Sequence, residues 1–385
     1  MTTSFPRIGR SRRLRPLGAA LCIAIAGVSS ASAASAIDPL RVPPGFRVEL
    51  LTDAVPNARQ MTLGRHGSDA GVVYVGSARA GNVYAVEYGA SGSGKARTIA
   101  TRLDTPSGVA WREGQLFVGA SSRVLRFDAI DDRLAQPPAP VVVTDRFPSE
   151  AHHGRRFIAF GPDGKLYVAV GSPCNICLPD ERHGVIQRIA REGGAIETVA
   201  RGVRNSVGFD WNPTDHALWF TDNGRDLLGD DLPADELNRV GAIGEHFGFP
   251  FCHQGDSPDP QFGKQRACAE FKAPAVLLGA HVAALGMRFY AGTQFPAAYR
   301  GNAFIAEHGS WNRSTKVGYQ VVRVAVDSQG HASVPEPFLW GFLQVDGTGR
   351  ETVSGRPADV LPLPDGSLLV SDDLAGAIYR VRFAQ

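Results

Sequence analysis

Two adjacent histidines near the middle of the sequence are the side chains best suited to accept a proton. His152 and His153 precede a strand-like segment that contains Phe160 and the turn Pro162–Gly164. Imidazole titrates near neutral pH, so His153 is a candidate general base for removing a hydroxyl proton. A lone loop histidine more often forms only a hydrogen bond, and the assignment therefore depends on the neighbouring motifs.

An arginine–asparagine pair is the next motif along the chain. Arg204 and Asn205 lie between Gly202 and Gly208, just before the segment Trp211–Pro213. An arginine can stabilise negative charge that grows during a reaction, and an asparagine amide can fix the plane of a bound group. The alternative for such a dipeptide is a surface turn with a solvated arginine.

Two acidic, oxygen-rich segments come next, at 222–226 and 234–238. Such segments suit calcium, which prefers oxygen ligands, although the spacing is not that of an EF-hand loop. The alternative is a solvated acidic loop around Asp226, Asp230 and Asp231.

Short β-strands must position these residues. Gly accounts for 44 of the 385 residues and Pro for 26, a turn-rich composition that favours short strands over long helices. Six strand phrases recur at the spacing of a four-stranded blade with its loops. We therefore expect an all-β chain, a six-bladed β-propeller, with a pair of β-sandwiches as the alternative. The phrases are 72–75, 115–118, 165–168, 217–220, 302–305 and 367–370.

The segment Gly45–Leu51 predicts a further strand that completes the last blade and closes the ring. The two long gaps, 227–278 and 326–357, are expected to hold long loops on a ligand-binding face.

The N-terminal segment has the pattern of a signal peptide. Several arginines precede an apolar stretch, Leu17–Val28, that is too short to span a bilayer, and Ala31–Ala33 offers a small-residue cleavage pattern. We expect residues 1–36 to be removed and residues 37–385 to form one domain in the periplasm or outside the cell, with no stable membrane anchor. The net charge of +2, without a basic stripe, gives no reason to expect nucleic-acid binding.

Four cysteines remain after this cleavage: Cys174, Cys177, Cys252 and Cys268. Export to an oxidising compartment favours disulfides, and a zinc site is the alternative. The sequence permits three pairings, of which the simplest joins Cys174 to Cys177 and Cys252 to Cys268.

Taken in order, these motifs resemble the soluble dehydrogenases of sugars that depend on pyrroloquinoline quinone (PQQ), most closely the L-sorbosone dehydrogenase branch. The resemblance runs from Arg41 to Phe383. It implies that His153 is the general base and that Arg204 and Asn205 contact the quinone oxygens. His152 stands where the family often carries Asp.

The resemblance also implies calcium ligands and groups that bind the three PQQ carboxylates. Calcium is expected on the carbonyl oxygens of Gly224 and Arg225, where the family usually has Pro at the second position, and a second ion on Glu236 and a carbonyl near Phe247. Cations suit the carboxylates, and Arg288 would substitute for a family lysine that is absent near Ala291. The expected cofactor-binding cations are Arg59, Arg288, Arg313 and Lys316, and the expected sugar-binding residues are His308 and Trp311.

The function that this resemblance implies is oxidation of an aldose, a sugar aldehyde or a related polyol by hydride transfer to PQQ, with calcium present. A soluble electron acceptor or a cytochrome would then reoxidise the cofactor. Two other classes stay open: a calcium-dependent lactonase-type hydrolase, and a non-catalytic propeller that binds carbohydrate or protein.

Overall fold

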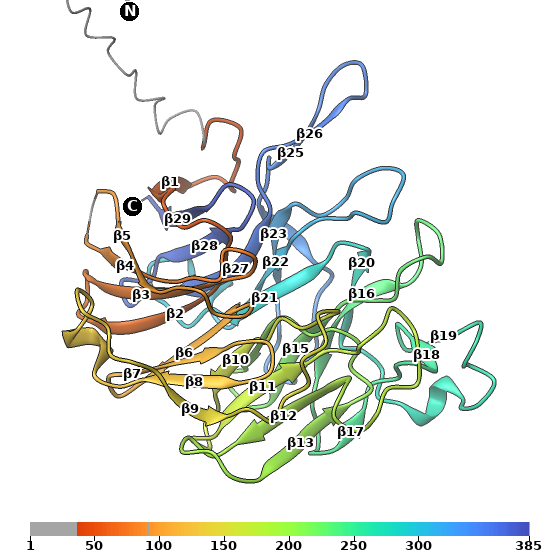
Figure 1. Cartoon of the computed structure of the whole chain (residues 1–385). Helices are drawn as coiled ribbons and strands as arrows, with labels where there is room; N and C mark the ends of the chain where they lie inside the picture. The colour runs from red at the N-terminus through yellow and green to blue at the C-terminus, as the bar shows by residue number, and fades with distance from the viewer. Residues whose placement is uncertain (1–36, 91, 385) are drawn as a thin grey trace, which may run out of the picture.

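The computed structural model describes residues 37–90 and 92–384, and most of their strands form six sheets that follow one another around a ring (Figure 1). Each sheet is a blade of four antiparallel strands, and the third blade adds a short parallel strand. The predicted all-β, six-bladed β-propeller is confirmed. The predicted signal peptide, residues 1–36, lies outside the described residues.

The first three blades follow the chain without interruption. The first contains β2 (Ala58–His66), β3 (Gly71–Ser77), β4 (Val83–Tyr88) and β5 (Lys95–Ala100); the second contains β6 (Gly108–Arg112), β7 (Gln115–Gly119), β8 (Val124–Phe127) and β9 (Val141–Thr144). The third contains β10 (Ile158–Phe160), β11 (Leu166–Val170), β12 (Val185–Ile189) and β13 (Ile196–Arg201), with β17 (Glu245–His246) parallel to β13.

The other three blades carry the longer insertions. The fourth contains β14 (Phe209–Trp211), β15 (Leu218–Asp222), β16 (Ala234–Arg239) and β20 (Val276–Ala280); the fifth contains β21 (Ala284–Phe289), β22 (Ala303–Glu307), β23 (Gln320–Val324) and β24 (Glu336–Leu339); the sixth contains β27 (Pro357–Pro362), β28 (Leu368–Asp372), β29 (Ala377–Phe383) and β1 (Phe46–Thr52). Outside the blades lie the hairpins β18 (Cys252–His253) with β19 (Ser257–Pro258) and β25 (Leu343–Val345) with β26 (Glu351–Val353), and the 3-10 helices η1 (Ile130–Asp132), η2 (Cys268–Glu270) and η3 (Ala297–Tyr299).

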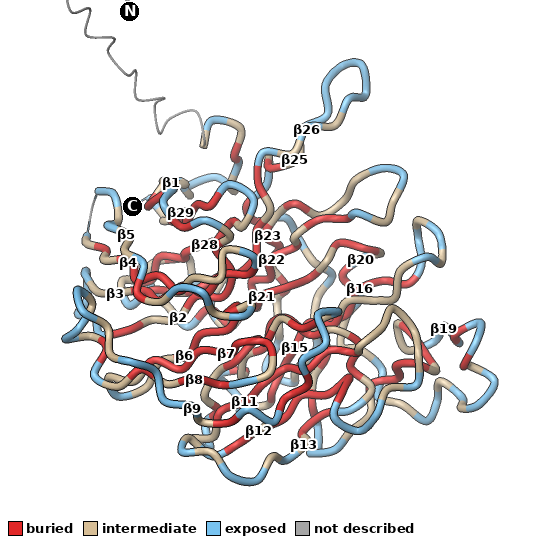
Figure 2. Tube along the Cα trace, viewed as in Figure 1, coloured by how far each residue is buried: buried red, intermediate tan, exposed pale blue. Residues whose placement is uncertain are grey.

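Each of the six predicted strand phrases is the second strand of a blade: β3, β7, β11, β15, β22 or β28. These strands are almost entirely buried, which explains their continuous apolar sequences (Figure 2). The predicted long loops are only partly found. The gap 227–278 contains the blade strand β16 and the start of β20, and the gap 326–357 contains β24. The mostly polar sequence of β16 concealed its strand pattern.

The first strand closes the ring by pairing with the last. β1 runs antiparallel to β29, with Val48 opposite Val381, so the two ends of the described chain share the sixth blade. Phe46 makes edge contacts with four aromatic rings, at centroid distances of 4.8 to 5.1 Å. The predicted closing strand is confirmed. Two of these rings, Phe295 and Phe338, belong to the fifth-blade side of the core, so Phe46 ties the closing strand to a neighbouring blade.

Replacing Phe46 by alanine should therefore weaken the closure of the ring. We expect the Phe46→Ala substitution to lower the free energy of unfolding by about 2–3 kcal/mol, below the usual cost of a fully buried Phe because Phe46 is half-buried. Urea unfolding measures this. Val345→Ala on the exposed hairpin β25–β26 is the matched control, and an equal loss in both variants would contradict the assigned role of Phe46.

Candidate active site

Loops from five of the six blades line a cavity of about 410 Å³ on one face of the propeller. In an antiparallel blade, the residue that enters the first strand and the residue that leaves the second strand lie at the same edge. The cavity is therefore built from those two positions in successive blades, and its size suits a small organic ligand. Its charged and imidazole-bearing residues are Arg59, Arg79, His153, Arg155, Arg204, Asp226, Asp235, His281, His308, Arg356 and Asp373.

Positive charge dominates this cavity, because five arginines face three aspartates. Arg59 pairs with Asp373 at 2.8 Å. Arg79, Arg155 and Arg356 form no ion pair within the described residues, and Arg155 Nε is buried without a hydrogen-bond partner there. The positive charge of Arg59, together with burial, lowers the pKa of Arg155 to about 10. A bound anion would relieve both the repulsion and the missing hydrogen bond.

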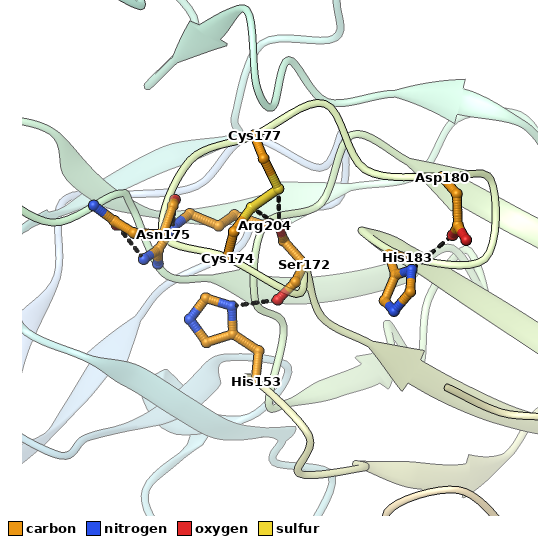
Figure 3. Close-up of a disulfide and its surroundings, with 8 residues drawn as sticks. All are labelled: His153, Ser172, Cys174, Asn175, Cys177, Asp180, His183 and Arg204. Atoms are coloured by element: carbon orange, nitrogen blue, oxygen red, sulfur yellow. Dashed lines mark hydrogen bonds and ion pairs between the residues drawn. A yellow bond between two sulfur atoms is a disulfide. The ribbon is translucent and has the colours of Figure 1, made fainter. Parts of the chain in front are cut away.

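His153 is held in the state that a general base requires. Its Nδ1 lies 2.9 Å from the carbonyl oxygen of Ser172 (Figure 3), and because a carbonyl can only accept, Nδ1 carries a proton. Burial and the charge of Arg204 hold the pKa of His153 well below its usual value, so the ring is neutral and Nε2 is unprotonated. The residue has a φ of +49°, and a Cβ on Gly171 would come within 2.5 Å of His153 Cβ. The surrounding backbone thus fixes the ring, as strained residues at functional sites often are.

His308 forms a second polar chain in the cavity. Its Nε2 lies 2.8 Å from Asp373 Oδ1, while Asp373 Oδ2 accepts a hydrogen bond from Arg59. Burial lowers the pKa of His308 to about 4, although Asp373 opposes that shift. Trp311, 70 % exposed, also lines the cavity and offers a ring face to solvent. The three predicted residues Arg59, His308 and Trp311 are thus brought together in one site.

Arg204 is buried, and protein acceptors engage its whole guanidinium. Its Nε donates to the carbonyl of Asn175, its NH1 to the carbonyls of Asn223 and Gly224, and its NH2 to Asn175 Oδ1 and Asp226 Oδ2. These distances lie between 2.7 and 3.1 Å, and a guanidinium has five N–H bonds in all. Arg204 therefore has no remaining donor with which to contact a quinone. The expected contact is not available in this geometry, and the adjacent Asn205 side chain lines the cavity instead.

The disulfide Cys174–Cys177 encloses Asn175, which is the main partner of Arg204 (Figure 3). Asn175 also accepts a hydrogen bond from the Asp226 backbone and donates one to its carbonyl. A second disulfide joins Cys252 to Cys268. Both predicted disulfide pairings are confirmed, and the first one fixes the loop that holds Arg204.

Several residues that were expected in the site lie outside the cavity, each with a local partner. Arg288 faces Asp359 at 3.5 Å and lies over the Phe157 ring. The remaining placements are Arg313 against Asp230 and Asp231, Lys316 against Glu351, Arg225 against Asp259, and Phe247 in the aromatic core beside Phe220.

Glu236 is also away from the cavity lining, buried beside Asp222 on the neighbouring strand. Its two carboxylate oxygens accept hydrogen bonds from the Gln254 backbone and from Asn238 Nδ2. Burial raises the pKa of both Asp222 and Glu236, and the negative charges of Asp222 and Asp235 raise that of Glu236 further. Asn238 Oδ1 has no hydrogen-bond partner within the described part of the chain.

A family model called TrAA12-like matches residues 40–383, which is almost all of the described chain. The chain belongs to the TrAA12-like family. An uncharacterized protein of Borreliella burgdorferi is 34% identical to it over 357 residues, 89% of this chain and 91% of that protein.

Solved structures share the fold of this TrAA12-like protein. The holo PQQ domain of the pyranose dehydrogenase from Coprinopsis cinerea has a TM-score of 0.73 at 19% identity, covering 89% of this chain and 97% of that one. An enzyme of carbohydrate-active family AA12 from Trichoderma reesei, in an iodide and a calcium structure, gives TM-scores of 0.75 and 0.71 at 20% identity, with the same coverage. At these identities the matches show a shared fold.

The sequence motifs missed several residues of the TrAA12-like site: Arg79, Arg155, His281, Arg356 and Asp373. Each is a single charged or imidazole side chain just before a first strand or just after a second strand, and only Arg155 lies beside a motif, the histidine pair. Their shared position was the signal that could have revealed them. Once the six second strands were found, any polar residue that flanks them becomes a candidate.

The buried carboxyl pair predicts how the stability of this TrAA12-like protein depends on pH. Because burial raises the folded-state pKa of Asp222 and Glu236, their contribution is fully present below the unfolded value near pH 4 and is lost as pH rises toward neutral. The free energy of unfolding in a chelator-containing buffer should thus fall with pH, by up to about 1.4 kcal/mol per pH unit for each extra bound proton.

Glu236→Gln should flatten this pH dependence, since glutamine does not titrate. If the Asn238 amide flips, the new side-chain NH2 group of Gln can donate a hydrogen bond to Asn238 Oδ1, which has no partner among the described residues of the native protein. The exposed Glu181→Gln is the control and should leave the pH dependence unchanged. Urea unfolding at a series of pH values measures both. A slope in Glu236→Gln identical to that of the native protein would contradict the assignment.

Proposed function

We propose that this protein is an exported PQQ-dependent dehydrogenase that oxidises a pyranose sugar, or a related sugar aldehyde such as sorbosone. The observation that carries the proposal is the cluster of arginines without ion-pair partners around the cavity. PQQ bears three carboxylates, and a planar tricarboxylate suits several guanidinium groups in a site of this size. The names of the structural relatives support PQQ as the anion and a pyranose as the substrate class.

Arg155 is the residue best placed to bind a cofactor carboxylate. It is half-buried in the cavity wall, its buried Nε lacks a partner within the described residues, and the neighbouring Arg59 repels it. Arg79 from the first blade and Arg356 from the sixth blade supply further positive charge to the cavity. The charge of Arg155 is one of the causes that lower the pKa of His153, after burial and Arg204, so an anion bound to Arg155 would shift that pKa back toward neutral, where a base is most effective.

The reaction that this geometry supports is removal of a sugar hydroxyl proton by His153 Nε2. When PQQ is bound, its quinone supplies the acceptor for the hydride that leaves the carbon bearing that hydroxyl. Ser172 keeps the imidazole in the required tautomer, and the exposed ring of Trp311 can stack on a sugar face at the rim. His308 would orient the substrate, because its Nε2–H is already directed to Asp373 and its Nδ1 is left as an acceptor.

The expected calcium ligands do not fit this geometry. The carbonyl of Gly224 accepts a hydrogen bond from Arg204, and both oxygens of Glu236 accept hydrogen bonds within the protein. The part of the chain that the structure describes holds no group of three or more His, Cys, Asp or Glu side chains suited to a metal ion, which a lactonase-type propeller would need. We assign no step of the reaction to calcium.

Localisation and electron transfer are part of the same proposal. Among residues 37–90 and 92–384, no helix is long and apolar enough to cross a membrane. The basic and apolar N-terminal pattern supports export to the periplasm, where a soluble acceptor or a cytochrome would reoxidise the cofactor.

The catalytic role of His153 is tested by His153→Ala. Because general-base catalysis is lost, we expect turnover with pyranoses to fall by about 100-fold or more, while the dissociation constant for PQQ is nearly unchanged. Dye reduction by the PQQ-loaded protein and fluorescence titration with PQQ provide the two measurements. His152→Ala is the control, since its ring lies against His153 but is not among the cavity residues. A larger loss of turnover in His152→Ala than in His153→Ala would show that His152, and not His153, is the base.

The anion-binding role of Arg155 is tested by Arg155→Leu. We expect PQQ to bind at least about tenfold more weakly, since one charge-assisted contact is lost. Arg288→Leu removes an arginine outside the cavity and serves as the comparison. Equal PQQ affinity in the native protein and in Arg155→Leu would remove this residue from the cofactor site.

A further inference from the structure

The geometry points to Arg204 as a built-in cation that takes the place of a metal ion at the carbonyl oxygens of Asn223 and Gly224, so that cofactor binding in this protein is independent of calcium. This inference rests on the proposed function for its cofactor. The two carbonyls are consecutive, and the NH1 group of Arg204 binds both, at 3.1 and 2.7 Å. A hard cation would seek the same arrangement of adjacent carbonyl oxygens with a carboxylate beside them.

A calcium ion and this guanidinium are poor neighbours. Calcium binds oxygen at about 2.4 Å, so an ion on the Gly224 carbonyl would lie within about 5 Å of Arg204 NH1. A divalent and a monovalent cation at that separation in a buried site repel strongly. The carboxylate of Asp226 is already paired with Arg204 at 3.0 Å.

The guanidinium cannot easily leave, because the structure holds it from two sides. Asn175 supplies two of its five acceptors and is itself held between the cysteines of the Cys174–Cys177 disulfide. On the other side, Arg225 anchors the carbonyl-bearing loop through a 2.6 Å ion pair with the fully buried Asp259. Displacing Arg204 would therefore leave a buried charge and several acceptors without partners, which is costly.

The position of Arg204 also explains what it can do for a bound cofactor. It lines the cavity, so its positive charge faces the ligand even though its N–H groups are engaged by the protein. A fixed, desolvated cation stabilises negative charge that grows on a neighbouring quinone without any exchange of ligands. This is the electrostatic part of the task that a bound metal ion would perform.

The test compares PQQ binding with and without calcium. The protein without its signal segment, stripped of metal, should bind PQQ with the same dissociation constant in EDTA and in millimolar calcium. Arg204→Ala should bind PQQ at least about tenfold more weakly in EDTA and recover in calcium, because the two carbonyls and Asp226 become available as ligands. Arg79→Ala removes a charge from the same cavity without touching these carbonyls, and its weaker binding should not respond to calcium.

Calorimetric titration with calcium alone completes the test. Arg204→Ala should bind one more equivalent of calcium than the native protein. Native protein that binds PQQ only in calcium would overturn the inference, as would equal calcium stoichiometry in the two proteins. If the native protein binds no PQQ in either buffer, the proposed function fails, and the calcium stoichiometry alone still decides whether Arg204 occupies a cation site.

Discussion

The pairing of β1 with β29 is the interaction on which the rest of the molecule depends, because it joins the two ends of the described chain within one blade. No single blade forms the cavity alone. It exists only where loops from five blades meet at one face, and those loops stay in place only while the ring is closed. A closed ring of rigid blades can therefore gather five arginines that would repel one another on a flexible surface.

Much of the fold could be predicted from the sequence. The second strand of every blade is buried on both faces, so its sequence is a short apolar run bounded by turn residues, and all six were found from that pattern. The third and fourth strands of the fourth blade, β16 and β20, and those of the fifth blade, β23 and β24, were not found. β16, with the sequence Ala-Asp-Glu-Leu-Asn-Arg, is buried yet mostly polar, since its side chains satisfy one another and the loops around them. Such a strand gives no hydrophobic period to recognise.

The candidate site could be predicted only in part. His153, Asn205 and His308 belong to extended motifs, and the structure places all three in the cavity. The contacts of Arg204 could not be foreseen, because its partners come from the disulfide loop of the third blade and from the loop after β15 in the fourth blade. Ion pairs between residues distant in sequence were equally hidden. This is why Arg288, Arg313 and Lys316, each with a carboxylate partner elsewhere, were expected in a site where they do not lie.

The most direct test of the central claim is a crystal structure of the protein soaked or crystallised with PQQ. We predict the cofactor in the 410 Å³ cavity, with a carboxylate on Arg155 and its quinone oxygens toward His153, while Arg204 keeps its contact with Gly224. PQQ bound outside the cavity, or an empty cavity at saturating PQQ, would contradict the claim that this arginine cluster is a cofactor site.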